Sequence, residues 1–110
     1  DQGAFVGIVQ APDGVSLSYT DRVLAQAEER MRAIPEVTST FVVSGAGFNG
    51  NGPNLGLFFG RLKHWDERTT RESSVRGVLQ RLNGSFRSIT DAIVVAFNPP
   101  AIPGFGAQGG

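Results

Sequence analysis

Hydrophobic residues recur along this chain with two different periods, and the change of period predicts its elements. Residues 4–11 (AFVGIVQA) form an apolar, β-rich run that ends at the turn-forming Pro12-Asp13-Gly14, so we expect a strand there. Ser18 and Asp21 then resemble a capping box, and a helix is predicted up to Pro35. Its apolar positions recur at helical spacing: Leu24, Ala27, Met31 and Ile34.

Two further strands are predicted on either side of a glycine-rich segment. Residues 37–44 (VTSTFVVS) and 55–62 (LGLFFGRL) are rich in β-branched and apolar residues and read as an antiparallel pair. Between them, residues 44–54 (SGAGFNGNGPN) contain four glycines and one aromatic residue, Phe48. A hairpin needs only two to five connecting residues, and glycine loses much conformational freedom on folding. We therefore expect a long loop here, kept for a function.

A second helix and a last strand complete the pattern. Ser73 or Ser74 is the expected cap, and the helix is expected to end near Asn83-Gly84. Its apolar stripe consists of Val75, Val78, Leu79, Leu82 and Phe86. Residues 92–98 (AIVVAFN) read as a strand that Pro99-Pro100 terminates.

The order strand, helix, strand, strand, helix, strand consists of two βαβ halves. Right-handed crossovers then predict an α+β, ferredoxin-like split βαβ sandwich, with a four-stranded antiparallel sheet, strands one and three central, and both helices on one face. We expect one domain over residues 1–98 and a Pro/Gly-rich linker over 99–110, leading to a following subdomain. The other sheet face would be left uncovered, which predicts a ligand or partner there.

Alternation with period two predicts which side chains face the helices. Phe58 and Phe59 must point to opposite faces, and because Leu62 shares a face with Phe58, we place Phe58 in the core and Phe59 on the uncovered face. On the first strand, Gln10 shares the uncovered face with Ile8. On the second strand, alternation alone would make the more apolar set, Phe41 and Val43, part of the core.

Composition and motifs argue against catalysis and cofactors. The chain has 110 residues, no cysteine, and ten basic residues that balance ten acidic ones. Thiolate chemistry is therefore excluded, and no net field favours nucleic acid. Residues 45–50 spell GxGxxG, but a strand rather than a helix is expected to follow, so we predict no dinucleotide site. The lone His64, beside Asp66 and Glu67, predicts neither a metal site nor an acid-base cluster.

Two other functions share this order of elements. An RNA-recognition module would stack bases on aromatic residues of the central strands, here Phe5, Phe58 or Phe59. The third strand lacks the basic start of the RNA-binding octamer, and the domain is neutral, so this is the alternative function. An acylphosphatase-like enzyme would need an arginine in the first strand-helix turn, where PDGVSLS has none.

Four segments in one order carry a resemblance to a known family: Asp1-Gln2-Gly3, residues 41–54, Leu62-Lys63-x-Trp65-x-x-Arg68 and Ala96-Phe97-Asn98-x-Pro100-Ala101-Ile102. Together they resemble the periplasmic porter region of RND-type multidrug efflux transporters, hydrophobe/amphiphile class. Within that region the chain is similar to the subdomain that follows the central transmembrane helices. The resemblance implies a non-enzymatic porter subdomain of a proton-driven pump, in the periplasmic part of an inner-membrane protein of a Gram-negative-type bacterium.

The same resemblance implies partners and site residues. Its partners would be hydrophobic or amphiphilic small molecules, other porter subdomains, two further copies in a homotrimer, a periplasmic adaptor and an outer-membrane channel, with no nucleic acid and no cofactor. The implied substrate-binding residues are Ile8, Gln10, Phe41, Val43, Ala46, Phe48, Phe59, Val95 and Phe97. The implied switch loop contains Gly45, Gly47, Gly50, Asn51 and Gly52.

For Phe41 and Val43 the resemblance and the alternation disagree, and we follow the resemblance, because a flat apolar face suits a drug pocket. The chain also departs from the family pattern. Members often carry a second loop aromatic where this chain has Ala46, a basic residue near Asn51, and a residue other than proline at Pro53. Loss of the aromatic is expected to widen the mouth of the pocket, and proline to restrict the loop.

Overall fold

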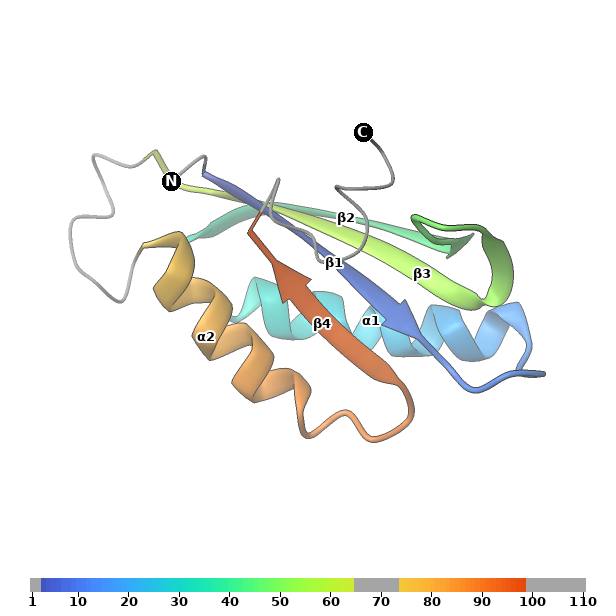
Figure 1. Ribbon diagram of the computed structural model, residues 1–110. Helices are drawn as coiled ribbons and strands as arrows, with labels where there is room; N and C mark the ends of the chain where they lie inside the picture. The colour runs from blue at the N-terminus through green and yellow to red at the C-terminus, as the bar shows by residue number, and fades with distance from the viewer. Residues whose placement is uncertain (1–2, 65–73, 99–110) are drawn as a thin grey trace.

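The six expected elements form in the expected order in a computed structural model, which describes residues 3–64 and 74–98 (Figure 1). They are β1 (Ala4–Gln10), α1 (Leu17–Arg32), β2 (Val37–Ala46), β3 (Asn51–Leu62), α2 (Val75–Phe86) and β4 (Ile93–Phe97). The sheet is antiparallel with strand order β2-β3-β1-β4, so β1 and β3 are central. Both helices lie on one side of it, which confirms the ferredoxin-like prediction (Figure 1).

The helix caps agree with the sequence at α2 and differ at α1. Ser74 caps α2, where its hydroxyl accepts a hydrogen bond from the Gly77 amide at 3.1 Å. The cap of α1 is Ser16 rather than the predicted Ser18, and the Ser16 hydroxyl accepts from the Tyr19 amide at 3.3 Å. Ser16 offers the same hydroxyl acceptor half a turn earlier, so Ser18 lies inside the first turn.

The glycine-rich segment is mostly strand, so the prediction of a loop over residues 44–54 was wrong. β2 continues to Ala46, β3 begins at Asn51, and these two residues pair. Only residues 47–50 connect the strands, closed by a 2.8 Å hydrogen bond from the Gly47 amide to the Gly50 carbonyl. The glycine content predicted a long loop, but the segments on either side of residues 47–50 pair and so extend the antiparallel ladder beyond the sheet body.

An irregularity in the β2–β3 register bends this extension. The pairing passes from Ser44 with Gly56 directly to Ala46 with Asn51, so β3 contributes extra residues opposite Gly45. Gly45 has φ of +83°, a left-handed conformation that residues with a Cβ rarely adopt. The hairpin tip thus leaves the sheet at a fixed bend, and Gly45 is the residue that permits it.

The core lies between the sheet and the helices and contains three large rings. Phe5, Phe58 and Phe86 are almost fully buried, and the Phe58 and Phe86 rings meet edge-on with centroids 5.6 Å apart. Phe86 explains why α2 does not end at Asn83-Gly84 as predicted. One more turn of helix is needed to bring this ring into the core, so Gly84 is accommodated inside the helix.

The side chain of Asn83 replaces a neighbouring strand at the edge of the sheet. Its amide nitrogen donates to the Ala96 carbonyl at 3.1 Å, and its carbonyl oxygen accepts from the Ala96 amide at 2.8 Å. α2 is therefore attached to β4 through backbone groups that would otherwise face solvent.

Two predictions fall outside the described residues. The linker over 99–110 is one of them, and the charged connector that contains Trp65, Asp66 and Glu67 is the other. The described part of the chain bears on neither.

Candidate functional site

The sheet face opposite the helices, which we call the open face, carries a set of side chains fixed by the strand register. Val6, Ile8 and Gln10 of β1 lie beside Phe59, Leu57 and Leu55 of β3. Partners in an antiparallel ladder share a face, so the register extends this set across the sheet. The open-face residues of the two edge strands are Ser39, Phe41 and Val43 on β2 and Ile93, Val95 and Phe97 on β4.

The open face contains all seven strand residues that were predicted to bind substrate: Ile8, Gln10, Phe41, Val43, Phe59, Val95 and Phe97. The placement of Phe41 and Val43 follows the family resemblance and contradicts simple alternation. A bulge at Thr38 is the reason. Val37 pairs with Leu62 and packs on the core, whereas Ser39 pairs with Arg61, so one residue is skipped and the faces of β2 exchange.

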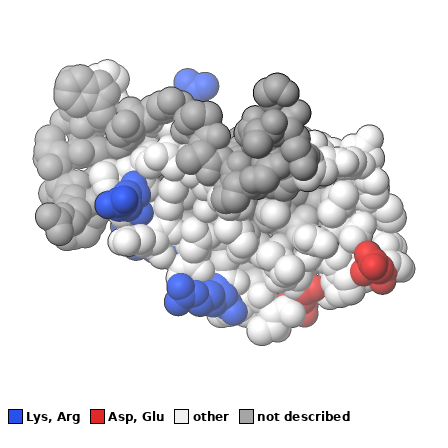
Figure 2. All heavy atoms as spheres, viewed as in Figure 1, with Lys and Arg blue, Asp and Glu red and all other residues white. Residues whose placement is uncertain are grey.

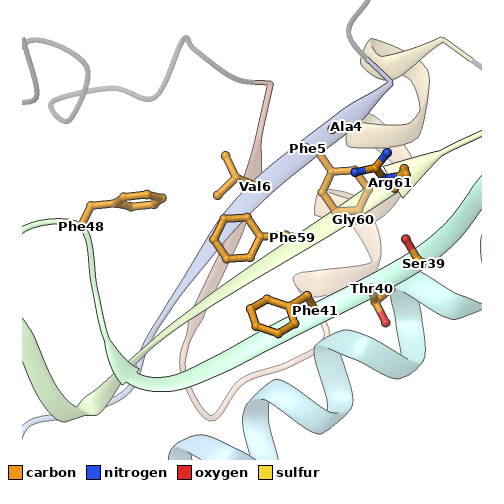
Figure 3. A pocket seen from close by; sticks show the side chains of 10 residues that line it. All are labelled: Ala4, Phe5, Val6, Ser39, Thr40, Phe41, Phe48, Phe59, Gly60 and Arg61. Carbon is orange, nitrogen blue, oxygen red and sulfur yellow. The ribbon is translucent and has the colours of Figure 1, made fainter.

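A hollow of about 490 Å³ lies on the open face over β1, β2 and β3 (Figure 3). We call it the aromatic hollow, because the rings of Phe41, Phe48 and Phe59 line it together with Val6 and Arg61. The Phe41 and Phe59 rings are tilted neighbours with centroids 6.1 Å apart. Phe41 is 62% exposed, so a large apolar surface is available to a ligand.

Phe48 reaches the aromatic hollow from the hairpin tip. Figure 3 shows its ring projecting towards Val6 and Phe59 from the opposite side to Arg61. A second, smaller hollow of about 220 Å³ lies beneath the tip and is also lined by Phe48, with Ile8, Gln10 and Leu55. The Phe48 ring therefore stands between two adjoining hollows, and a movement of the tip would change the size of both.

The predicted loop residues divide between the tip and its strands. Gly47 and Gly50 lie in the tip and line the small hollow. Gly45 and Ala46 end β2, while Asn51 and Gly52 begin β3, and these four are outside the lining of either hollow. The predicted substrate-binding set omitted Val6, Leu55 and Arg61, although alternation places Val6 on the same face as Ile8, and Leu55 and Arg61 on the same face as Phe59.

The base of the hairpin is anchored to the rest of the domain. Thr20 of α1 is fully buried, and its hydroxyl donates to the Pro53 carbonyl. The side-chain amide of Asn54 donates to the Ala11 carbonyl at 3.1 Å, and the Ala11 amide returns a bond to the Asn54 carbonyl at 2.8 Å. Movement of the hairpin is therefore expected to be confined to residues 46–52, which lie between Gly45 and Pro53.

Charge is scarce on the open face. Among the described strand residues, the register places one charged side chain there, Arg61. Figure 2, which views the molecule from the side of β4 and α2, shows basic atoms at the top, at the left and along the lower edge, and acidic atoms at the lower right. Within residues 3–64 and 74–98, no group of three His, Asp or Glu side chains is placed to hold a metal ion. Neither described helix combines the length and apolarity needed to cross a bilayer. The arrangement can bind an apolar molecule.

Comparisons with known proteins identify relatives along the whole chain. The model of the AcrB/AcrD/AcrF family matches residues 1–110. The multidrug resistance protein MdtF of Escherichia coli is 39% identical over 112 residues, covering 100% of this chain and 11% of MdtF. The multidrug export protein AcrF of Escherichia coli is 36% identical, with the same coverage. The toluene efflux pump membrane transporter TtgB of Pseudomonas putida is 40% identical over 104 residues, covering 93% of this chain and 10% of TtgB.

Proposed function

The chain belongs to the AcrB/AcrD/AcrF family of RND multidrug efflux transporters, and we propose that its open face and hairpin tip form one wall of a drug-binding pocket. The chain spans about a tenth of the length of the curated relatives it matches, with 11% of MdtF covered. We therefore propose that this segment is part of a larger protein. To that larger protein we assign export, proton coupling, assembly as a homotrimer, contact with an adaptor and an outer-membrane channel, and a periplasmic location for this segment. The contribution of this chain is substrate contact.

One observation carries the proposal. The aromatic hollow is lined mostly by apolar residues from three strands and the hairpin tip, with Ser39, Thr40 and Arg61 as its polar members. Its rings Phe41, Phe48 and Phe59 are at least a third exposed. An apolar concavity with a few polar groups is the usual form of a small-molecule site. The two aromatic rings of Phe41 and Phe59 present faces and edges to flat or bulky apolar compounds without a fixed hydrogen-bond pattern, which suits a site that accepts many substrates.

Phe48 would serve as the movable part of this wall. Its ring borders both hollows, and it stands on a four-residue tip between Gly47 and Gly50. Glycine at both ends lets the tip change conformation at low steric cost, while ordering the phenyl ring restricts only two side-chain torsions. We propose that the tip admits a compound to one hollow and closes behind it.

Drug susceptibility tests the proposal in a complete transporter that carries this segment, expressed in bacteria without other pumps. Phe59→Ala and Phe48→Ala are expected to reduce resistance to bulky apolar compounds at unchanged protein abundance, because each removes ring surface from the aromatic hollow. Leu79→Ala is the control, since it removes a half-buried apolar side chain from the helix side, which packs on the core. It should change resistance only in proportion to the amount of protein.

The opposite result would identify the hairpin as structural filler. In that case Phe48→Ala would leave resistance to every compound unchanged. Gly47→Pro gives a second readout, because proline removes the amide that bonds the Gly50 carbonyl and restricts the backbone torsion. A tip that moves during export requires this variant to lose resistance to most compounds while the protein remains in the membrane.

A further inference from the structure

One charged side chain stands on the open face, at the rim of the aromatic hollow. Arg61 follows Phe59 by two residues on β3, so both side chains leave the sheet on the same side, and both line the hollow. Among the described residues, every other open-face position is uncharged. These positions are Ala4, Val6, Ile8, Gln10, Ser39, Phe41, Val43, Leu55, Leu57, Phe59, Ile93, Val95 and Phe97.

The neighbours of Arg61 leave its guanidinium accessible and its charge uncompensated. Its ladder partners are Ala4 on one side and Ser39 on the other, both small and neither ionisable. Arg61 is exposed, and in the described part of the chain no carboxylate lies within ion-pair distance of it. The Thr38 hydroxyl donates a hydrogen bond to the backbone carbonyl of Arg61 at 3.1 Å. Relative to the described residues, a ligand would therefore supply the counter-charge of Arg61.

The strand register orders the open face from charged to apolar. The row of Arg61, with Ser39 and Ala4, is followed by the row of Phe59, with Phe41, Val6 and Phe97. The next row contains Leu57, with Val43, Ile8 and Val95. Alternate residues of a strand are about 7 Å apart, so Leu57 lies about 13 Å from Arg61 along β3. The side chains between them are apolar, and the guanidinium of Arg61 stands at one end of this apolar surface. Figure 3 shows Arg61 on the opposite side of Phe59 from Phe48.

We propose that this site prefers anionic amphiphiles, whose apolar body lies on Phe59 and Phe41 and whose carboxylate, sulfonate or sulfate pairs with Arg61. The inference rests on the proposed function and adds a charge preference to it. A guanidinium stays charged at every physiological pH, and its planar fork can donate two parallel hydrogen bonds to such a head group. A cationic amphiphile in the same position would meet a like charge.

The experiment compares two probes with the same tail and opposite head charge. The 110-residue chain, at a concentration where sedimentation shows a monomer, is titrated with decanoate and with decyltrimethylammonium below their micelle concentrations. Binding is followed by NMR shifts at Phe59 and Arg61. Decanoate is expected to bind more tightly. Arg61→Gln should weaken decanoate binding about tenfold and leave decyltrimethylammonium binding equal or stronger. Arg61→Lys should retain part of the preference, because it keeps the charge and loses the fork.

Arg32→Gln is the matched control, since it removes the same charge from a 69% exposed position on α1, away from the open face. It should leave both affinities unchanged, and each variant should keep the backbone spectrum of the folded chain. Equal binding of both probes, with no effect of Arg61→Gln, would overturn the charge preference and leave the apolar pocket standing. Absence of binding by both probes would also overturn the charge preference. The proposed function is tested separately, by the drug resistance of bacteria that carry the Phe59→Ala transporter.

Discussion

Two glycines on the central strands leave no room for a Cβ, and Gly60→Ala measures what a Cβ there would cost in stability. Gly60 pairs with Phe5, and the Phe5 ring lies directly over it, as the Phe58 ring lies over Gly7. A Cβ on Gly60 would be 2.2 Å from Phe5 Cζ, whereas ordinary contacts begin near 3.4 Å. The ring would have to move by more than an ångström, and at 1% exposure it has no solvent to move into.

Overpacking of this kind costs about 1–3 kcal/mol, and Gly60 is expected near the upper end because the three nearest atoms all belong to the rigid, buried ring of Phe5. In a domain of this size, 1 kcal/mol shifts the melting temperature by about 4–8 °C. Gly60→Ala should therefore lower the melting temperature by at least 10 °C, measured by circular dichroism on the 110-residue chain. That loss would be a large part of a typical stability of about 5–15 kcal/mol.

Gly84→Ala is the control, because Gly84 lies in the last turn of α2 and a Cβ there would meet nothing within 4 Å. It should stabilise the domain by about 0.5–1 kcal/mol, since alanine has the higher helix propensity. Phe5→Leu should partly rescue Gly60→Ala, because a shorter side chain makes room for the new methyl group. A Gly60→Ala protein that melts with the wild type, or a double variant that is merely additive, would refute the steric reasoning.

Three further outcomes are expected. Thr20→Val should cost about 1–3 kcal/mol in urea denaturation, because it leaves the Pro53 carbonyl without its buried donor; an unchanged midpoint would show that the anchor is dispensable. The 110-residue chain should self-associate through its open face, as Phe41 is 62% exposed, and sedimentation of a strict monomer at high concentration would contradict this. Binding to single-stranded RNA should be negligible at physiological salt, and micromolar affinity with a steep salt dependence would instead favour an RNA-recognition function.

Much of the fold could be predicted because the period of the hydrophobic pattern changes clearly between strands and helices. β1 and β3 lie at the centre without a bulge where they pair, so alternation assigned Phe58 to the core and Phe59 to the open face correctly. The same rule failed on β2, because the bulge at Thr38 shifts every later residue by one. A single sequence carries no local signal for such a bulge.

The candidate site was less accessible to sequence reasoning. The glycine-rich segment predicted a long loop, because a high glycine content indicates a flexible backbone. It does not indicate that Ala46 pairs with Asn51. That Phe48 folds back to border the same hollow as Phe41 depends on the bend at Gly45, which is a three-dimensional fact. The binding roles of these residues stay predictions until the variants above are measured.

The bond between Asn83 and Ala96 makes the two edges of the sheet unequal. At the β4 edge a carboxamide already occupies both backbone groups of Ala96, so an incoming strand would first have to displace it. The opposite edge is β2, whose ten residues include no charged residue and no proline. Within the described chain, β2 is hydrogen-bonded to a strand on one side only, so its other side is open to an incoming strand. The sheet can therefore gain a further strand at its β2 edge and not at its β4 edge. Copies that meet edge to edge would stop at a pair rather than propagate into a fibril.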